Sequence, residues 1–244
     1  MKEQTTAPLC PNCHEIMEPR SGRKGPFWGC PKYRETGCRG TAPMPLDEAL
    51  NPTGVEPGFI VVVDTETTGT GPLAEVIEIA VLVLFAADLR PVAPVWSGLA
   101  RPRNPIPPEA TAVHGITDEM VTEMPSPVRV VVDAINYAEQ HTRASPAAWL
   151  AHNASFDLAM IDRALGPGAP RTGWPVYCSL ALAREAFPRM RSHRMEHLAA
   201  RLGLPAQTAH RAFGDVQTTA AMVRKVLKVW DDFNWGGLRL AGRL

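Results

Sequence analysis

From residue 59 to residue 69 the chain reads Phe59-Ile60-Val61-Val62-Val63-Asp64-Thr65-Glu66-Thr67-Thr68-Gly69. The unbroken apolar run at its start is typical of a buried strand. Side chains alternate along a strand, so the carboxylates of Asp64 and Glu66 are expected on the same side. Two such charges repel by about 1 kcal/mol in water and about 4 kcal/mol in a partly buried site. A hard divalent cation, Mg²⁺ or Mn²⁺, would offset this repulsion, although the pair alone also fits a solvated strand end.

The residues that follow predict a mixed α/β fold. Further strands are expected at residues 76–85, 92–99 and 147–151. Apolar residues at helical spacing predict helices around residues 128–135, 156–164, 195–202 and 212–230. Gly203 is placed to end the third of these helices. Three strands followed by alternating helices and strands predict an α+β or α/β domain whose mixed central sheet is flanked by helices.

Length and composition leave room for one ordinary domain and a small appendage among 244 residues, of which 45% are apolar. We expect a cysteine-rich module at 1–45, a linker at 46–58, the main domain at 59–230 and a tail at 231–244. Lys+Arg and Asp+Glu balance at 25 each, which argues against a protein coated in positive charge but leaves nucleic acid open as a partner. No apolar run is long enough to span a membrane and the polar start is unlike a secretory signal, so the expected compartment is the cytoplasm.

Two later segments carry further candidate residues. In His152-Asn153-Ala154-Ser155-Phe156-Asp157, Asn153 is placed to cap a helix, and Asp157 falls in its first turn, where the helix dipole stabilises a carboxylate. In His210-Arg211-Ala212-Phe213-Gly214-Asp215, the two end residues differ by about 140° around a helix. His210 and Asp215 can therefore converge only if His210 lies on the loop before the helix.

Together the three segments resemble the three motifs of the DnaQ-like exonuclease family, in its histidine-containing DEDD subgroup. Val62–Gly69 resembles the first motif, residues 152–157 the second and residues 210–215 the third. The stretch Cys178-Ser179-Leu180-Ala181-Leu182-Ala183-Arg184 resembles the segment before the family's last two helices. The likeness runs from about Phe59 to Lys228 and implies a ribonuclease H-like exonuclease fold.

The resemblance implies a metal-dependent 3′→5′ exonuclease, and the direction of digestion comes from the resemblance alone. The implied ligands of two Mg²⁺ or Mn²⁺ ions are four acids, Asp64, Glu66, Asp157 and Asp215. His210 would take the proton from the attacking water, because imidazole titrates near neutral pH. The implied substrate contacts are Thr67, Glu109, His114 and Asn153.

Four of the five cysteines lie in the first 40 residues, as Cys10, Cys13, Cys30 and Cys38. An odd total and a C-x-x-C start favour thiolates that hold a metal over a disulfide framework. The spacing predicts a site for one Zn²⁺ with four cysteine ligands, in which the second pair is wider than usual. Cys178 is interpreted as a small buried apolar residue.

The cysteine module also resembles the C-terminal zinc ribbons of type I topoisomerases, and its Glu35-Thr36-Gly37-Cys38 end departs from that family's pattern. Basic and aromatic residues are interleaved in it, which suits single-stranded DNA. The candidate contacts are Arg23, Lys24, Phe27 and Trp28. The alternatives are that the aromatic residues form the ribbon's small core, or that the ribbon serves protein contact.

The expected function is therefore hydrolysis of DNA at 3′ ends in repair, end processing or proofreading, with the ribbon aiding single-strand binding. An RNA 3′-exonuclease and a non-catalytic nucleic-acid-binding protein are the alternatives. The expected partners are single-stranded DNA or DNA 3′ ends and a DNA polymerase or repair complex; the sequence leaves the oligomeric state open.

Overall fold

The computed structural model describes residues 8–22, 25–43, 57–143, 145–169, 171–204, 210–230, 233, 235 and 240–243. The chain divides into two compact units. The smaller unit comprises Met1–Gly54 and Gly236–Arg239, and the larger comprises Val55–Trp235 and Leu240–Leu244. Within the described ranges, no helix has the length and apolar character needed to cross a membrane.

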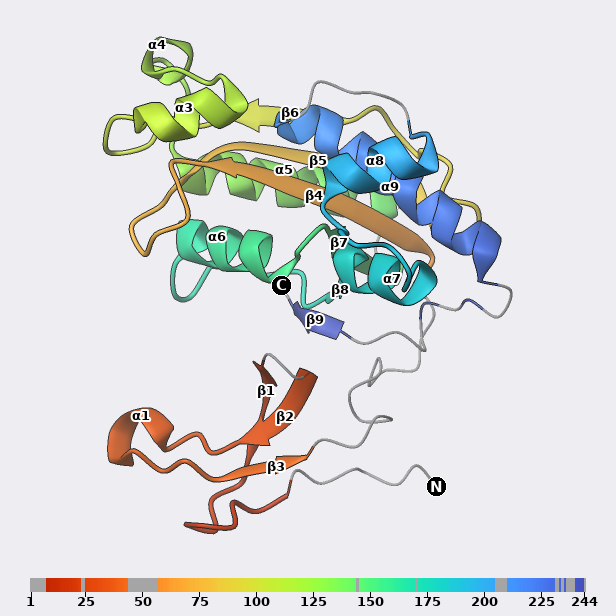
Figure 1. Ribbon diagram of the computed structural model, residues 1–244. Helices are drawn as coiled ribbons and strands as arrows, with labels where there is room; N and C mark the ends of the chain where they lie inside the picture. Colours follow the sequence, from red (N-terminus) through yellow and green to blue (C-terminus); the bar gives the residue numbers. More distant parts are fainter. Residues whose placement is uncertain are drawn as a thin grey trace. The chain divides into compact units, whose positions relative to one another are not determined.

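A mixed sheet of six strands forms the larger unit (Figure 1), in the order β6-β5-β4-β7-β8-β9. The strands are β4 (Phe59–Thr67), β5 (Val76–Phe85), β6 (Trp96–Leu99), β7 (Ala147–Ala151), β8 (Pro175–Cys178) and β9 (Leu240–Arg243). β4, β5 and β6 pair antiparallel, and β7 and β8 continue the sheet parallel to β4. β9 lies at the edge of the sheet, antiparallel to β8. The predicted mixed sheet flanked by helices is confirmed.

The helices of this unit are α3 (Pro108–His114), α4 (Asp118–Val121), α5 (Pro127–Thr142), α6 (Ser155–Leu165), α7 (Ser179–Ala186), α8 (Met195–Leu202) and α9 (Ala212–Val229). α5 and α6 cover one face of the sheet, and α9 covers the other, with α7 and α8 packed against α9. Figure 1 shows these helices around the long strands β4 and β5.

The alternation of β4 assigns its residues to the two faces. Val61 and Val63 join the core with Val131 and Ala134 of α5 and Met160 of α6. The even-numbered residues of β4 consequently point to the α9 face, where Ile60 and Val62 are fully buried. Asp64 and Glu66 continue this same row of side chains.

The smaller unit has a three-stranded antiparallel sheet, β1 (Glu18–Gly22), β2 (Gly25–Gly29) and β3 (Thr41–Pro43), and the short helix α1 (Tyr33–Thr36). Its core is small: Cys10, Met17 and Cys30 are buried, and Trp28, Cys38 and Ala42 pack against them. The cysteines therefore form much of the interior, as expected for a module that a metal stabilises.

Several elements differ from the expectation. β4 extends beyond the apolar run Phe59–Val63 as far as Thr67, and β6 covers only the second half of the expected strand at 92–99. The larger unit also continues past residue 230. The Trp235 indole is buried, donates to the Ala86 carbonyl at 3.2 Å and packs on Tyr177, and β9 pairs with β8. Cys178 is only half-buried and packs at the edge of the core.

Candidate active site

Three carboxylates meet on the α9 face of the sheet. Asp64 and Glu66 come from the end of β4, and Asp215 comes from the first turn of α9. One oxygen of each can be chosen so that all three lie within 4.8 Å of one another. A register shift between Glu66 and Thr67 interrupts the strand pairing next to this cluster, and irregularities such as β-bulges re-aim side chains at functional sites. Oxygen ligands at this separation fit a hard divalent cation.

Asp157 lies beside these three carboxylates but is held by a different set of contacts. It stands in the first turn of α6 and is 3% exposed. One of its oxygens accepts the Thr65 backbone N–H at 3.1 Å and the Thr65 hydroxyl at 2.8 Å. Thr65 belongs to the opposite face of β4 from Asp64, so Asp157 reaches the site from the α6 side. Its charge still raises the pKa of Asp64.

The electrostatics of the cluster favour a cation. Burial raises the pKa of Glu66 to about 8, and the carboxylates of Asp215 and Glu78 contribute to this rise. Burial also raises the pKa of Asp157 to about 7, against the hydrogen bonds from Thr65. The pKa of Asp64 lies well above its usual value for the same reason, burial first and neighbouring carboxylates second. Acids that resist ionisation in a metal-free site become good ligands once a divalent cation supplies the missing charge.

His210 occupies the predicted position on the loop before α9. It is exposed, has a left-handed backbone with φ of 59°, and precedes the helix by two residues. The pKa of Asp215 is raised by burial, and the nearby His210 imidazole and backbone N–H lower it. This interaction places His210 at the rim of the carboxylate cluster, where its ring can reach water.

An ion pair between half-buried Arg211 and buried Glu78 fixes the start of α9. The Arg211 guanidinium donates to both oxygens of Glu78, at 3.0 and 2.7 Å, and the Ala212 backbone N–H donates to Glu78 at 3.0 Å. Glu78 is 2% exposed and lies directly across the sheet from Glu66. Two like charges in such a pair would destabilise the sheet. Arg211 neutralises Glu78, which leaves Glu66 as the carboxylate available for a cation. Sequence reasoning missed this pair, because its members are 133 residues apart.

The candidate substrate contacts are spread around the site. Thr67 is buried, and its hydroxyl donates to the Gly69 carbonyl at 2.7 Å. His114 is buried against the Thr67 backbone, and its Nδ1 accepts the Ile116 N–H at 3.0 Å. Glu109 is exposed on α3. These three roles stay predictions.

Asn153 corrects one expectation. It does not cap α6: the cap position is Ala154, without a side-chain hydrogen bond. Asn153 instead has φ of 68° in a tight turn after β7 and is exposed. Asparagine tolerates this left-handed backbone, which explains its presence as well as a cap would. Its substrate role stays a prediction.

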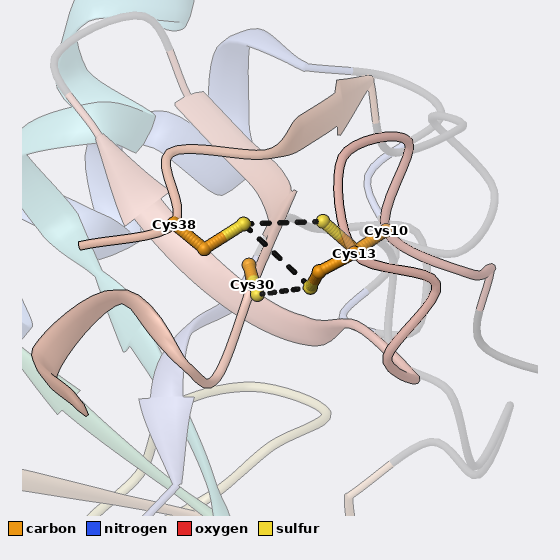
Figure 2. Close-up of side chains that lie close together, drawn as sticks. All are labelled: Cys10, Cys13, Cys30 and Cys38. Atoms are coloured by element: carbon orange, nitrogen blue, oxygen red, sulfur yellow. Dashed lines mark hydrogen bonds between the residues drawn. The ribbon is translucent and has the colours of Figure 1, made fainter. Parts of the chain in front are cut away.

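The four N-terminal cysteines form a second candidate metal site (Figure 2). All four sulfurs lie within 4.8 Å of one another, and individual S···S separations are 3.7 Å for Cys10–Cys38, 3.4 Å for Cys13–Cys30 and 3.6 Å for Cys13–Cys38. A tetrahedral zinc site with bonds of about 2.3 Å places its sulfurs about 3.8 Å apart. The cysteines are free thiols and are too far apart for disulfides.

Backbone groups around these sulfurs suit thiolates. Burial raises the pKa of Cys10, but the backbone N–H groups of Asn12 and Cys13 lower it to a net value of about 7. Burial and the neighbouring Cys13 raise the pKa of Cys30 to about 12, although a hydrogen bond from the Lys32 backbone lowers it. A bound Zn²⁺ would deprotonate such a thiol. The four residues therefore fit zinc in donor type, separation and surrounding dipoles.

For three of the four predicted nucleic-acid contacts of the ribbon, the side chain is not among those that the structure describes. Arg23 and Lys24 lie outside the described residues, and the Phe27 side chain is likewise not described. Trp28 is half-buried and packs against the cysteine core, in keeping with the alternative that aromatic residues build the ribbon's interior.

Known proteins share the sequence and fold of the larger unit. The sequence profile of the family described as Exonuclease (RNase_T) matches residues 61–223. A DNA polymerase III PolC-type protein of Bacillus cereus is 32% identical over 170 residues, which are 69% of this chain and 11% of that protein. A DNA polymerase III subunit epsilon-like protein of Rhodobacter capsulatus is 34% identical over 185 residues, 74% of this chain and 25% of that protein. The chain thus spans about a quarter or less of these two relatives.

Among solved structures, one described as Exonuclease X in complex with 5′ overhanging duplex DNA superposes with a TM-score of 0.56 and 27% identity. The superposition covers 72% of this chain and 96% of that one. The sequence profile spans the residues that carry the carboxylate cluster, so the shared family region and the candidate site coincide.

Proposed function

Because the chain belongs to the DnaQ-like exonuclease family, we propose that it removes nucleotides from the 3′ ends of DNA by divalent-metal-dependent hydrolysis. The observation that carries this proposal is the meeting of Asp64, Glu66 and Asp215 within 4.8 Å, with Asp157 beside them. Four acids would repel the phosphates of a ligand that was merely bound, so a cation-dependent reaction explains them better than binding alone.

The chain's own residues have distinct tasks in this proposal. The four carboxylates would hold two Mg²⁺ or Mn²⁺ ions, which when bound would supply an activated water and stabilisation of the leaving 3′-oxygen. Thr65 keeps Asp157 oriented through two hydrogen bonds. His210, exposed at the rim, accepts the proton of the attacking water at its imidazole nitrogen. The ion pair of Arg211 with Glu78 fixes the start of α9 and with it the positions of His210 and Asp215.

Labelled oligonucleotides test the proposal. Single- and double-stranded DNA and RNA, labelled at either end, are incubated with the full-length protein in Mg²⁺, Mn²⁺ or EDTA. We expect stepwise release from the 3′ end of DNA with either metal and none in EDTA. Release from the 5′ end, or activity indifferent to EDTA, would defeat the proposal. Faster digestion of RNA than of DNA would make RNA the preferred substrate.

Two variants sharpen this test. Asp64→Asn removes one charge from the cluster and should abolish release. Glu139→Gln removes one charge from an exposed position of α5 and should leave the rate unchanged. Equal rates for the two variants would show that the carboxylate cluster is not the site of the reaction.

We further propose that the cysteine site holds one Zn²⁺ and that the ribbon aids the binding of single-stranded DNA. The S···S separations and the N–H groups directed at Cys10 support the zinc. The basic and aromatic composition of residues 20–39 supports the proposed binding of single-stranded DNA. Zinc measured by atomic emission on purified protein should be one per chain.

The relatives suggest where such an enzyme works. Both relatives named above carry DNA polymerase III in their names, which supports a role beside a DNA polymerase. A pull-down of the full-length chain with a replicative polymerase subunit from the same cell tests this. Absence of polymerase binding with the catalytic activity intact would favour a stand-alone role in repair or end processing.

A further inference from the structure

The segment from Arg184 to Arg201 carries five arginines and two glutamates. The arginines, called here the α7–α8 arginine surface, are Arg184, Arg189, Arg191, Arg194 and Arg201. All five are exposed. Their positive charge is concentrated in a chain whose total charge is balanced, so it requires a local explanation.

These arginines differ from most others of the catalytic unit in having no partner among the residues that the structure describes. Elsewhere in this unit eight arginines bond a carboxylate or a backbone carbonyl: Arg90, Arg101, Arg103, Arg129, Arg163, Arg171, Arg211 and Arg224. Within the described ranges, none of the five on the α7–α8 surface makes a side-chain hydrogen bond or ion pair. Exposed Arg143 shares this property but stands apart from them at the end of α5. Unpaired guanidinium groups are ready to bind an anion.

The loop that carries them is held in place by histidines instead. His193 bonds the Phe187 carbonyl at 3.0 Å, and His197 bonds the Ser192 hydroxyl at 2.9 Å. His152, next to the catalytic turn, bonds the His193 carbonyl at 3.1 Å and Ser179 at 3.0 Å. The loop backbone is thus ordered before any ligand arrives, which lowers the free-energy cost of binding.

Two grooves meet on this surface. One, of about 690 Å³, runs from His152 and Asn153 past Arg184 to Arg191 and Arg194. The other continues from Arg191 and Ser192 to Arg189 and Arg201. They share Arg191 and Ser192, so together they form a track that starts at the turn before Asp157 and leads outward over α8. Figure 1 shows α7 and α8, the helices that flank this track.

We propose that the α7–α8 arginine surface binds the phosphates of the DNA strand that enters the active site, several nucleotides away from the bond that is cut. Arginine forks match phosphate oxygens, and a row of them along a groove follows a backbone without reading its sequence. Glu185 and Glu196, the two acids of this segment, are exposed and leave a net positive charge. This inference rests on the proposed function, since it assigns part of the substrate to a surface outside the carboxylate cluster.

The test compares two double variants in the full-length protein. Arg191→Gln with Arg194→Gln removes two charges from the track. Lys225→Gln with Lys228→Gln removes two exposed charges from the far end of α9 and serves as the matched control. Affinity for a fluorescent twelve-nucleotide single strand is measured with Ca²⁺ over a series of salt concentrations. Turnover is measured on that strand and on thymidine 5′-(p-nitrophenyl phosphate), which carries no distant phosphates.

We expect the arginine variant to bind the strand about tenfold more weakly or worse, a loss of about 1.4 kcal/mol or more, because it loses charge-assisted hydrogen bonds to phosphate. The slope of log affinity against log salt should become shallower by about one for each phosphate that an arginine no longer neutralises. The KM of this variant for the strand should rise, while its turnover of the small ester should equal that of the wild type and of the lysine variant.

The outcomes separate the two proposals. If the wild type cleaves neither substrate, the proposed function fails. If the wild type cleaves both and the arginine variant matches it in strand affinity and salt slope, the inference is overturned. An arginine variant that keeps strand affinity but no longer binds an acidic peptide would assign the surface to a protein partner and would also overturn it.

Discussion

Carboxylates that repel one another are the main feature of the site at the scale of single residues. Asp64, Glu66 and Asp215 lie within 4.8 Å, and burial and neighbouring carboxylates raise the pKa of each. Without a cation, burial and the neighbouring carboxylates disfavour the ionised form of each acid. A proton or a cation that neutralises the cluster therefore stabilises the folded chain.

The raised pKa values predict how metal-free protein responds to pH. The pKa of Glu66 is about 8 when folded against a usual 4.5, so between these values the folded protein binds more protons than the unfolded chain. The contribution of Glu66 to the free energy of unfolding is highest below about pH 4.5 and is lost as the pH rises to about 8. One pKa unit corresponds to about 1.4 kcal/mol, and 1 kcal/mol moves the melting temperature by about 2–4 °C at this size.

Melting curves in EDTA from pH 5 to pH 8.5 measure this effect. We expect a falling melting temperature that Mn²⁺ restores at high pH, and a smaller fall for Glu66→Gln. A melting temperature that rises over this range, or does not respond to Mn²⁺, would contradict the assigned repulsion.

His210 predicts a separation between binding and turnover. A positioned general base contributes about 10²–10⁴-fold, so His210→Ala should lower kcat by that factor. DNA affinity measured with Ca²⁺ should change little, because the ring is exposed at the rim of the site. His141→Gln, a substitution on α5, is the control and should keep kcat. Near-normal turnover in His210→Ala would remove the histidine from the proton-transfer role.

At the scale of elements, the start of α9 depends on Glu78. Removing one partner of an exposed ion pair costs about 1 kcal/mol or less, and of a buried pair about 3–5 kcal/mol. With Glu78 buried and Arg211 one-third exposed, Glu78→Gln should fall between these limits. It should also lower kcat at least about tenfold with little change in KM, because a small misplacement of catalytic groups is costly.

Asp133→Asn is the matched control for Glu78→Gln. It breaks the exposed pair with Arg129 on α5 and should alter neither stability nor kcat measurably. Thermal melting and steady-state kinetics of both variants decide the matter. If Glu78→Gln behaved like the control, the ion pair would not position the helix.

In the ribbon, Gly40 predicts an effect on zinc. A Cβ on Gly40 would lie 2.1 Å from the Cys10 sulfur. The φ angle of Gly40 is not in the left-handed region, so the contact with sulfur is what disfavours a side chain there. Gly40→Ala must therefore displace the sulfur, and we expect most of the bound zinc to be lost in a colorimetric assay after EDTA challenge. Gly37→Asn, at an open left-handed position, should retain it. Full zinc retention in Gly40→Ala would place the metal elsewhere.

The sequence predicted the elements whose patterns are local. β5, β7 and α8 form where periodicity placed them, and Gly203 ends α8 in a left-handed conformation. β9 was missed because its pairing with β8 is set by tertiary contact, and a strand of four residues has little pattern of its own. At the site, the three motifs predicted four acids, of which the structure brings Asp64, Glu66 and Asp215 together. The Glu78–Arg211 pair was not predicted, because it depends on two distant segments meeting.

On the scale of the whole molecule, the chain joins a unit with the candidate metal cluster to a unit with the cysteine site. We expect deletion of residues 1–45 to weaken affinity for long single strands while turnover of thymidine 5′-(p-nitrophenyl phosphate) stays the same. Fluorescence anisotropy and ester hydrolysis measure the two. Unchanged affinity would give the ribbon a role in protein contact.

In the proposed reaction, water attacks the phosphorus of the 3′-terminal nucleotide while the 3′-oxygen of the neighbouring nucleotide leaves. Digestion of a DNA strand with Mg²⁺ in water enriched in ¹⁸O, followed by mass spectrometry of the products, tests it most directly. We expect nucleoside 5′-monophosphates that each carry one ¹⁸O on phosphorus, released in order from the 3′ end and absent with Asp64→Asn. Products with a 3′-phosphate, or 5′-monophosphates without the isotope, would contradict it.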